Sequence, residues 1–143
     1  MASPNVEIVR KVFDAAARRD TAAIFDLYDP YIVWDASRTE RGAITGRVAQ
    51  GRDALLKWLR EWYEPWETVE DILEELIDAG QQRMVSIMIQ RGRGRASGVE
   101  VENRLGTVWT IQDGKVIRVV WFPSREDALK AAGLSDQDAQ AES

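Results

Sequence analysis

One carboxylate in the sequence is positioned to do acid–base chemistry. Asp35 directly follows the β-rich run 31–34, and the alternation of a strand places Tyr31, Val33 and Asp35 on one face. If that face lines a cavity, Asp35 lies among apolar side chains, where burial disfavours the charged form and equips the group to transfer a proton. The alternative is a solvated residue at the end of a strand.

The residue types that are missing narrow the chemistry further. The chain of 143 residues contains no histidine and no cysteine, which excludes Ser-His-Asp and Cys-His triads, disulfides and most zinc sites. A protein-bound metal would need oxygen ligands, and the sequence holds no spaced carboxylate loop of the calcium-binding kind. We therefore expect neither a metal nor an organic cofactor, and acid–base work falls to Asp, Glu, Tyr, Lys or water.

A second set of candidates lies on a predicted long strand over 99–111. Asn103, Thr107 and Trp109 share one face of this strand. If the face points inward, Asn103 and Thr107 can hydrogen-bond a ligand oxygen while Trp109 packs on the apolar body of the ligand. The alternative is a core face whose polar groups are satisfied internally. The opposite face, which carries Glu102 and Arg104, is expected to point outward.

Aromatic residues are prominent in the sequence. It has six tryptophans, and Trp58, Trp62 and Trp66 recur at four-residue spacing. A lining rich in aromatic side chains suits an apolar ligand, whereas the alternative for each tryptophan is a place in the core or in a dimer interface. The aromatic residues that we predict to bind a ligand, besides Trp109, are Phe13, Tyr31, Trp62 and Tyr63.

The charge of the chain argues against nucleic acid as a partner. The formal net charge is −5, and an acidic domain is a poor ligand for polyanions. Arginine alternates with glycine over 91–95, as in nucleic-acid-binding segments, but the acidic total and the hairpin position favour a solvated loop. The acidic run 70–78 is expected to face solvent. Without a signal-like start or an apolar run of about 20 residues, we expect a cytoplasmic protein that binds neither nucleic acid nor membrane.

The elements that must position these residues follow from periodicity. Helical spacing predicts helices over 4–18, 20–28, 52–64 and 125–132. Alternation predicts strands over 31–35, 66–78, 83–90, 99–111 and 116–122, although the glutamate-rich middle of 66–78 is also compatible with a helix. Asp113-Gly114 signals a hairpin. Helices that precede a strand-rich half predict the α+β class.

Three pieces of the chain carry a resemblance to a known family. They are the run from Asp20 through Asp29-Pro30 to Val33-Trp34-Asp35, the glycine-containing loop that leads to the helix at Arg52, and the hairpin 108–117 with the segment 125–134 after it. Over residues 5 to 134 the chain resembles the SnoaL-like branch of the nuclear transport factor 2-like superfamily. Because this fold is a shared scaffold for several reactions and for binding modules, the resemblance specifies fold better than function.

The resemblance implies a particular architecture. We expect a cone-shaped, strongly curved antiparallel sheet, of the cystatin-like or nuclear transport factor 2-like kind, with N-terminal helices that enclose a pocket. Residues 1–134 would form one SnoaL-like domain and residues 135–143 a disordered tail. Relatives of this kind pack as homodimers through the outer face of the sheet, and we expect the same here.

Ketosteroid isomerase is the most informative relative, because it pairs an Asp base with an oxyanion hole made of a Tyr and a protonated Asp. Asp35 matches the position of the base. The counterpart of the Tyr is about Val12, and that of the protonated Asp is about Gly106 or Thr107. The polyketide cyclases of the branch are expected to use a His with an Asp, and this chain has no His. The resemblance therefore implies a pocket carboxylate but not the machinery of ketosteroid isomerisation.

These observations leave two hypotheses. The first is a cofactor-independent isomerase, cyclase, dehydratase or hydrolase that binds a small hydrophobic metabolite in its cavity, with Asp35 as acid–base. The second is a non-catalytic module for ligand binding or dimeric assembly. A closed apolar cavity, or an Asp35 that is salt-bridged and faces solvent, would favour the second.

Overall fold

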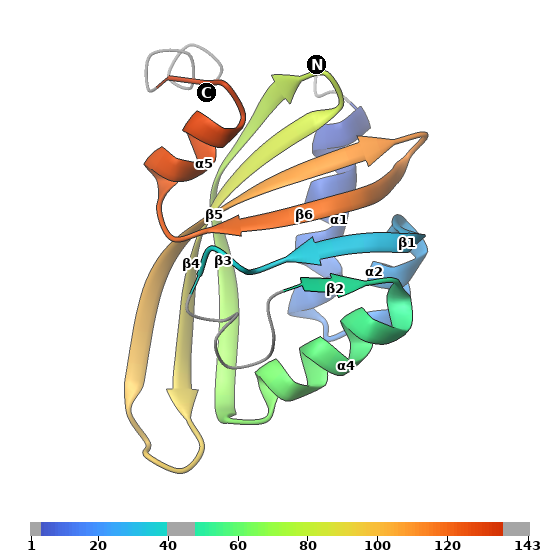
Figure 1. The fold of residues 1–143 in the computed structure, drawn as a ribbon. Helices are drawn as coiled ribbons and strands as arrows, with labels where there is room; N and C mark the ends of the chain where they lie inside the picture. Colours follow the sequence, from blue (N-terminus) through green and yellow to red (C-terminus); the bar gives the residue numbers. More distant parts are fainter. Residues whose placement is uncertain (1–3, 40–47, 136–143) are drawn as a thin grey trace.

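The computed structural model describes residues 4–39 and 48–135 of the chain. The helices within these ranges are α1 (Pro4–Ala17), α2 (Thr21–Leu27), α4 (Arg52–Tyr63) and α5 (Arg125–Ala131). The strands are β1 (Tyr28–Asp35), β2 (Val48–Gln50), β3 (Trp66–Gly80), β4 (Arg83–Gly94), β5 (Glu100–Gln112) and β6 (Lys115–Phe122). These elements confirm the predicted α+β class, and Figure 1 shows their arrangement.

The six strands form one curved sheet in the order β2-β1-β6-β5-β4-β3. Hairpins join β3 to β4, β4 to β5 and β5 to β6, so these neighbours are antiparallel. The pair β1–β6 is parallel, which departs from the expected all-antiparallel sheet. The reason is that the two strands are separated by most of the chain, so no tight turn fixes their relative direction. The short strand β2 lies in a region that was predicted as loop.

Local sequence signals set several element ends. Asp20 caps α2, where its Oδ1 accepts a hydrogen bond from the Ala23 N–H at 3.1 Å. Ser124 caps α5 in the same way through the Asp127 N–H. Asp113 and Gly114 both have positive φ, at 52° and 78°, as a two-residue type I′ hairpin requires. The predicted strand over 66–78 is confirmed as part of β3, despite its glutamate-rich middle.

The sheet separates two apolar clusters. The larger one lies on the concave face, beneath α1, α2 and α4, and includes Trp34, Trp109 and Trp121. The smaller one lies on the convex face, where Phe122 and Val108 pack against Ala128 and Leu129 of α5. Any residue on a strand therefore belongs either to the concave face with the N-terminal helices or to the convex face with α5.

The arginine–glycine segment is part of β4 rather than of a loop. The strand continues to Gly94, and Arg91 pairs with Glu102 on β5 at 2.9 Å. Arg93 lies 3.6 Å from Glu67 on β3. A Cβ on Gly92 would come within 2.9 Å of the Trp66 ring, so the glycine is required by packing. The predicted loop was placed too early because the glycines were taken as turn residues.

Candidate ligand-binding pocket

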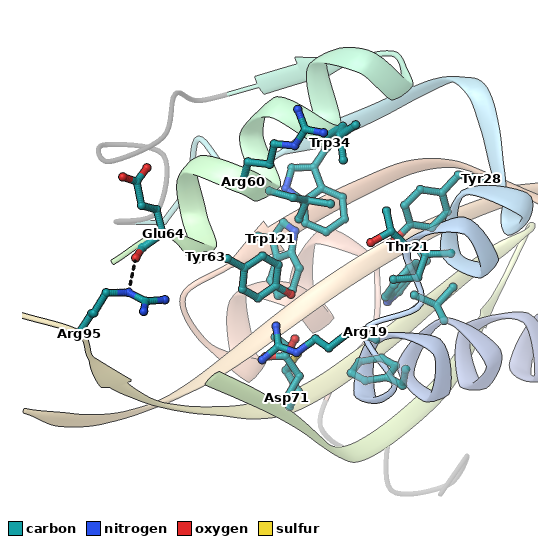
Figure 2. A pocket seen from close by; sticks show the side chains of 18 residues that line it. Arg19, Thr21, Tyr28, Trp34, Arg60, Tyr63, Glu64, Asp71, Arg95 and Trp121 are labelled. Atoms are coloured by element: carbon teal, nitrogen blue, oxygen red, sulfur yellow. Dashed lines mark hydrogen bonds between the residues drawn. The ribbon is translucent and has the colours of Figure 1, made fainter. Parts of the chain in front are cut away.

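The concave face of the sheet and the N-terminal helices form a partly open pocket of about 780 Å³. Its walls come from α1, α2 and α4 on one side and from β1, β3, β4, β5 and β6 on the other (Figure 2). The residues that line it are Val12, Phe13, Ala16, Arg19, Thr21, Ile24, Tyr28, Trp34, Leu56, Leu59, Arg60, Tyr63, Glu64, Asp71, Met88, Arg95, Trp109 and Trp121.

Aromatic side chains form much of the inner wall. Trp34 and Trp121 lie with ring centroids 5.3 Å apart, and Trp109 packs against Phe13 of α1 at 6.2 Å. The Trp109 indole N–H donates to the Ser86 hydroxyl at 2.9 Å, which fixes the orientation of the ring. These rings give the pocket an apolar interior, and the contacts between them and the hydrogen bond to Ser86 hold the ring positions.

The remaining tryptophans stand behind this wall. Trp34 contacts Trp58 at 5.6 Å, Trp58 contacts Trp62 at 6.2 Å, and Trp62 contacts Trp66 at 5.5 Å. The four-residue spacing noted in the sequence thus forms one row along α4 and the start of β3. Trp34, Trp109 and Trp121 line the pocket, whereas Trp58, Trp62 and Trp66 support it from outside.

Tyr28 brings a polar group into the apolar interior. It is the first residue of β1 and is 2% exposed. Arg52, at the start of α4, holds the backbone here, because its Nη2 donates to the Tyr28 carbonyl at 2.6 Å. Burial raises the pKa of the Tyr28 phenol well above its usual range, and the nearby Tyr63 phenol adds to the rise. Tyr28 therefore stays neutral and offers an O–H donor.

Charged groups gather on one side of the pocket (Figure 2). Arg19 donates through Nη2 to the Val69 carbonyl at 2.8 Å and lies over the Tyr63 ring at 5.0 Å. Arg95 donates to the carbonyls of Glu64 and Trp66, at 3.2 Å and 3.0 Å. The side chains of these arginines are thus held by backbone oxygens and by a ring face.

Asp71 is a pocket carboxylate that the sequence analysis missed. It lies in the acidic run that was predicted to face solvent, but β3 pairs it with Gln90 on the concave face. The Gln90 amide donates to Asp71 Oδ1 at 2.8 Å, and Gln90 is 6% exposed. The alternation of a strand could have identified Asp71 as an inward residue. Asp71 and Leu73 share one face of β3, while Glu70 and Ile72 share the other.

Asp35 lies outside this lining. On β1 the inward residues are Ile32 and Trp34, whereas Tyr31 is 84% exposed. The strand turns this way because Ile32 and Trp34 together bury the larger apolar area. Asp35 Oδ1 accepts hydrogen bonds from the Ser37 N–H and hydroxyl at 2.9 Å and 2.6 Å, and Oδ2 lies 3.8 Å from Arg118. The face chosen for the cavity in the sequence analysis was the wrong one.

The other predicted site residues separate into two groups. Phe13, Tyr63 and Trp109 line the pocket together. Asn103 is exposed and lies outside the lining. Thr107 is fully buried and lies outside the lining, and its Oγ1 has no hydrogen-bond partner in the part of the chain that the structure describes. Trp62 is a buried member of the tryptophan row.

The sequence and the fold place the chain in a family. Residues 9–119 match the SnoaL-like domain family. The chain belongs to the SnoaL-like family. The predicted resemblance is thereby confirmed, and the solved structures described next agree with the nuclear transport factor 2-like fold. No curated protein matches this chain in sequence.

Three solved structures illustrate the shared fold. One is a nuclear transport factor 2-like protein of unknown function from Burkholderia pseudomallei, with TM-score 0.77 and 18% identity over 90% of this chain and 97% of that one. TerC, co-crystallised with polyporic acid, gives a TM-score of 0.76 and 18% identity over 92% of this chain and 99% of that one. A hypothetical protein with a ketosteroid isomerase-like fold from Catenulispora acidiphila, in complex with trimethylamine, gives 0.69 and 16% over 90% and 94%.

Two further observations bear on the function classes. Within residues 4–39 and 48–135, no helix is long and apolar enough to cross a membrane. In the same ranges, no three acidic residues gather in a way that could hold a metal ion. The predicted homodimer, the location in the cell and the division into a domain and a tail stay predictions, and residues 136–143 of that tail lie outside the described part.

Proposed function

We propose that this SnoaL-like protein binds a small, ring-bearing, mostly apolar molecule in the pocket and hydrogen-bonds an acceptor oxygen of that molecule through Tyr28. The observation that carries the proposal is a lining of aromatic and aliphatic side chains around one buried, neutral phenol. A ligand site is typically an apolar cavity with a few polar groups that fix orientation.

The size of the pocket supports a molecule of two to four fused rings. Its volume of about 780 Å³ lies in the range of about 300–1,000 Å³ that is common for small-molecule sites. TerC was co-crystallised with polyporic acid, and the Catenulispora protein with trimethylamine. These two structures support a small organic ligand. Because the identities are low, the chemistry of the ligand is inferred from the residues of this chain.

Tyr28→Phe tests the role of the phenol. We expect β-tetralone, a fused-ring ketone, to bind the variant about 3–10-fold more weakly, because a neutral hydrogen bond contributes about 0.5–1.5 kcal/mol. Tetralin, which lacks the carbonyl oxygen, should bind both proteins alike. Isothermal titration of both compounds measures the difference. Tyr31→Phe is the matched control, since Tyr31 is 84% exposed and outside the lining. An equal loss for ketone and hydrocarbon would contradict a hydrogen bond from Tyr28.

Acid–base catalysis is a second candidate function, and Asp71 is the observation that favours it. Among the residues that the structure describes, Glu64 and Asp71 are the two with carboxyl groups that line the pocket. Glu64 is exposed at the edge beside Arg95, whereas Asp71 is half-buried and fixed by Gln90 (Figure 2). A fixed carboxylate in such a setting can accept a proton from a carbon next to a ligand carbonyl and return it to the resulting enol.

Asp71→Asn tests this second function without knowledge of the natural ligand. In heavy water, the wild type is expected to speed deuterium uptake at the carbon atoms beside the β-tetralone carbonyl, as followed by proton NMR at mildly acidic pH. The Asp71→Asn variant should lose about 10²–10⁴-fold of the catalysed rate, the usual contribution of a general base. Asp35→Asn is the matched control and should retain the rate. Equal exchange with and without the wild-type protein would rule out this function for the ketone.

A further inference from the structure

The charged side of the pocket indicates what kind of apolar molecule it takes. Resting on the proposed function, we infer that the ligand is a ring-bearing acid whose carboxylate or equivalent oxyanion binds Arg19, while the rings fill the apolar interior. The inference rests on the backbone of Arg19, on the way its guanidinium is held, and on the absence of a carboxylate partner.

The backbone at Arg19 has a left-handed conformation that glycine adopts most readily. After α1 ends, the Arg19 N–H donates to the Ala16 carbonyl at 3.1 Å and the Asp20 N–H to the Ala15 carbonyl at 2.9 Å, which closes the helix in a left-handed turn. Arg19 itself has φ 59°, the position where helix ends usually carry glycine. A side chain kept at such a position points to a role for that side chain.

The guanidinium of Arg19 is oriented before any ligand arrives. Its Nη2 is bound to the Val69 carbonyl of β3 at 2.8 Å, and the group lies 5.0 Å from the centre of the Tyr63 ring on α4. The planar fork has five N–H donors, and one of them is used by Val69. A cation that is held in this way binds a carboxylate with less loss of side-chain entropy than a free one.

Several arginines on the outer side of the sheet and on α5 have carboxylate partners, unlike Arg19. There, Arg91 pairs with Glu102, Arg104 with Glu74, and Arg125 with Glu75, at 2.9, 2.9 and 2.6 Å. Among the described residues, no carboxylate forms a salt bridge with Arg19, although Asp71 lines the same pocket. Asp71 instead accepts the Gln90 amide.

Among the described residues, the charged lining as a whole has an excess of one cation. Arg60 of α4 also lines the pocket and forms no salt bridge with any described residue. Arginines 19, 60 and 95 face Glu64 and Asp71, so cations outnumber carboxylates in the lining. An anionic ligand would form a charge-assisted contact with the guanidinium of Arg19. The apolar rings of the ligand would exclude water there, which lowers the local dielectric and strengthens that contact.

Three probes with one ring system separate the possibilities: β-naphthoate, β-naphthamide and the β-naphthylmethylammonium cation. Titration calorimetry should show that the wild type binds the acid at least about tenfold more tightly than the amide, and the cation most weakly, because charge-assisted contacts are roughly twice as strong as neutral ones. Arg19→Gln should remove most of the preference for the acid, because binding of the acid weakens far more than binding of the amide. Arg19→Lys should keep part of it, since the charge remains but the fork is lost.

Arg18→Gln is the matched control for net charge. Arg18 is the neighbouring residue, its side chain is 61% exposed, and it does not line the pocket; both affinities should stay within about twofold, as for other surface substitutions. If none of the three probes binds the wild type, the proposed function fails and the inference with it. If the amide binds as tightly as the acid, or if the cation binds best, binding in the pocket stands and the inference about Arg19 is overturned.

Discussion

Ala16→Trp is expected to abolish ligand binding while the protein stays folded. Ala16 lies on the inner side of α1, is half-buried and lines the pocket. A tryptophan side chain at this position would extend into the space between α1 and the aromatic wall and displace ligand rings that pack there. Affinity for β-tetralone and for β-naphthoate should fall by roughly 100-fold or more, equivalent to about 2.7 kcal/mol. Titration calorimetry measures this, and thermal melting confirms the fold.

The neighbouring residue provides the control for this substitution. Ala17 is the last residue of α1, is exposed and is outside the lining. Ala17→Trp adds the same side chain to the same helix and should leave both affinities unchanged. If Ala16→Trp is folded and binds like the wild type, the ligand does not occupy the space between α1 and the sheet, and the proposed function is wrong.

Gly106→Ala is expected to lower the free energy of unfolding strongly, although it adds a single methyl group. Gly106 lies on the convex face of β5, directly under α5. A Cβ there would stand 2.5 Å from the Ala128 Cβ and 2.9 Å from the Ser124 carbonyl oxygen, far inside the contact distance of about 3.5–4.0 Å. Neither the Ser124 carbonyl nor the Ala128 Cβ can move independently of the backbone, so α5 must shift. We expect the free energy of unfolding to fall by about 3 kcal/mol.

Gly94→Ala is the matched control on the neighbouring strand. The nearest atom to its added Cβ is Ser97 Oγ, at 2.7 Å, and a hydroxyl at the tip of an exposed turn can rotate away. In urea denaturation of the two variants, the free energy of unfolding should therefore fall by less than about 1 kcal/mol for Gly94→Ala. Equal losses would mean that α5 does not pack on β5 as described.

The fold could be predicted from the sequence largely because its signals are local. The cap at Asp20, the hairpin at Asp113-Gly114 and the alternation in β4 each act within a few residues. The parallel pairing of β1 with β6 could not be predicted in this way. The direction of this pairing depends on how strands that are distant in sequence pack together, and no turn between them determines it.

The candidate site could be predicted only in part, because the two faces of a strand look alike until one of them is packed. Phe13, Tyr63 and Trp109 line the pocket because the periodicity of a helix or a strand already places each of them on the inner side of its element. Asp35 was chosen for its resemblance to a catalytic position, yet the burial of Ile32 and Trp34 turns it to the convex face. Asp71 was missed because it lies in a run of acidic residues, and such a run is normally expected to face solvent.

The pocket differs from the ketosteroid isomerase pattern in the source of its hydroxyl. The counterpart position on α1 is Val12, which lines the pocket but carries no polar group. Tyr28, on β1, supplies a phenol from a different wall, and burial keeps it protonated. A shared scaffold with displaced polar groups is consistent with a ligand, or a reaction, that differs from those of the isomerase.

Fluorine NMR of protein labelled with fluorotryptophan tests the central claim most directly. The six tryptophans report on the pocket separately, because Trp34, Trp109 and Trp121 line it and Trp58, Trp62 and Trp66 do not. On titration with β-naphthoate, the signals of the lining tryptophans, assigned by Trp→Phe variants, should shift and saturate together, while those of the supporting row move far less. Saturable binding that leaves the lining signals in place, or that moves the supporting row alone, would contradict the account.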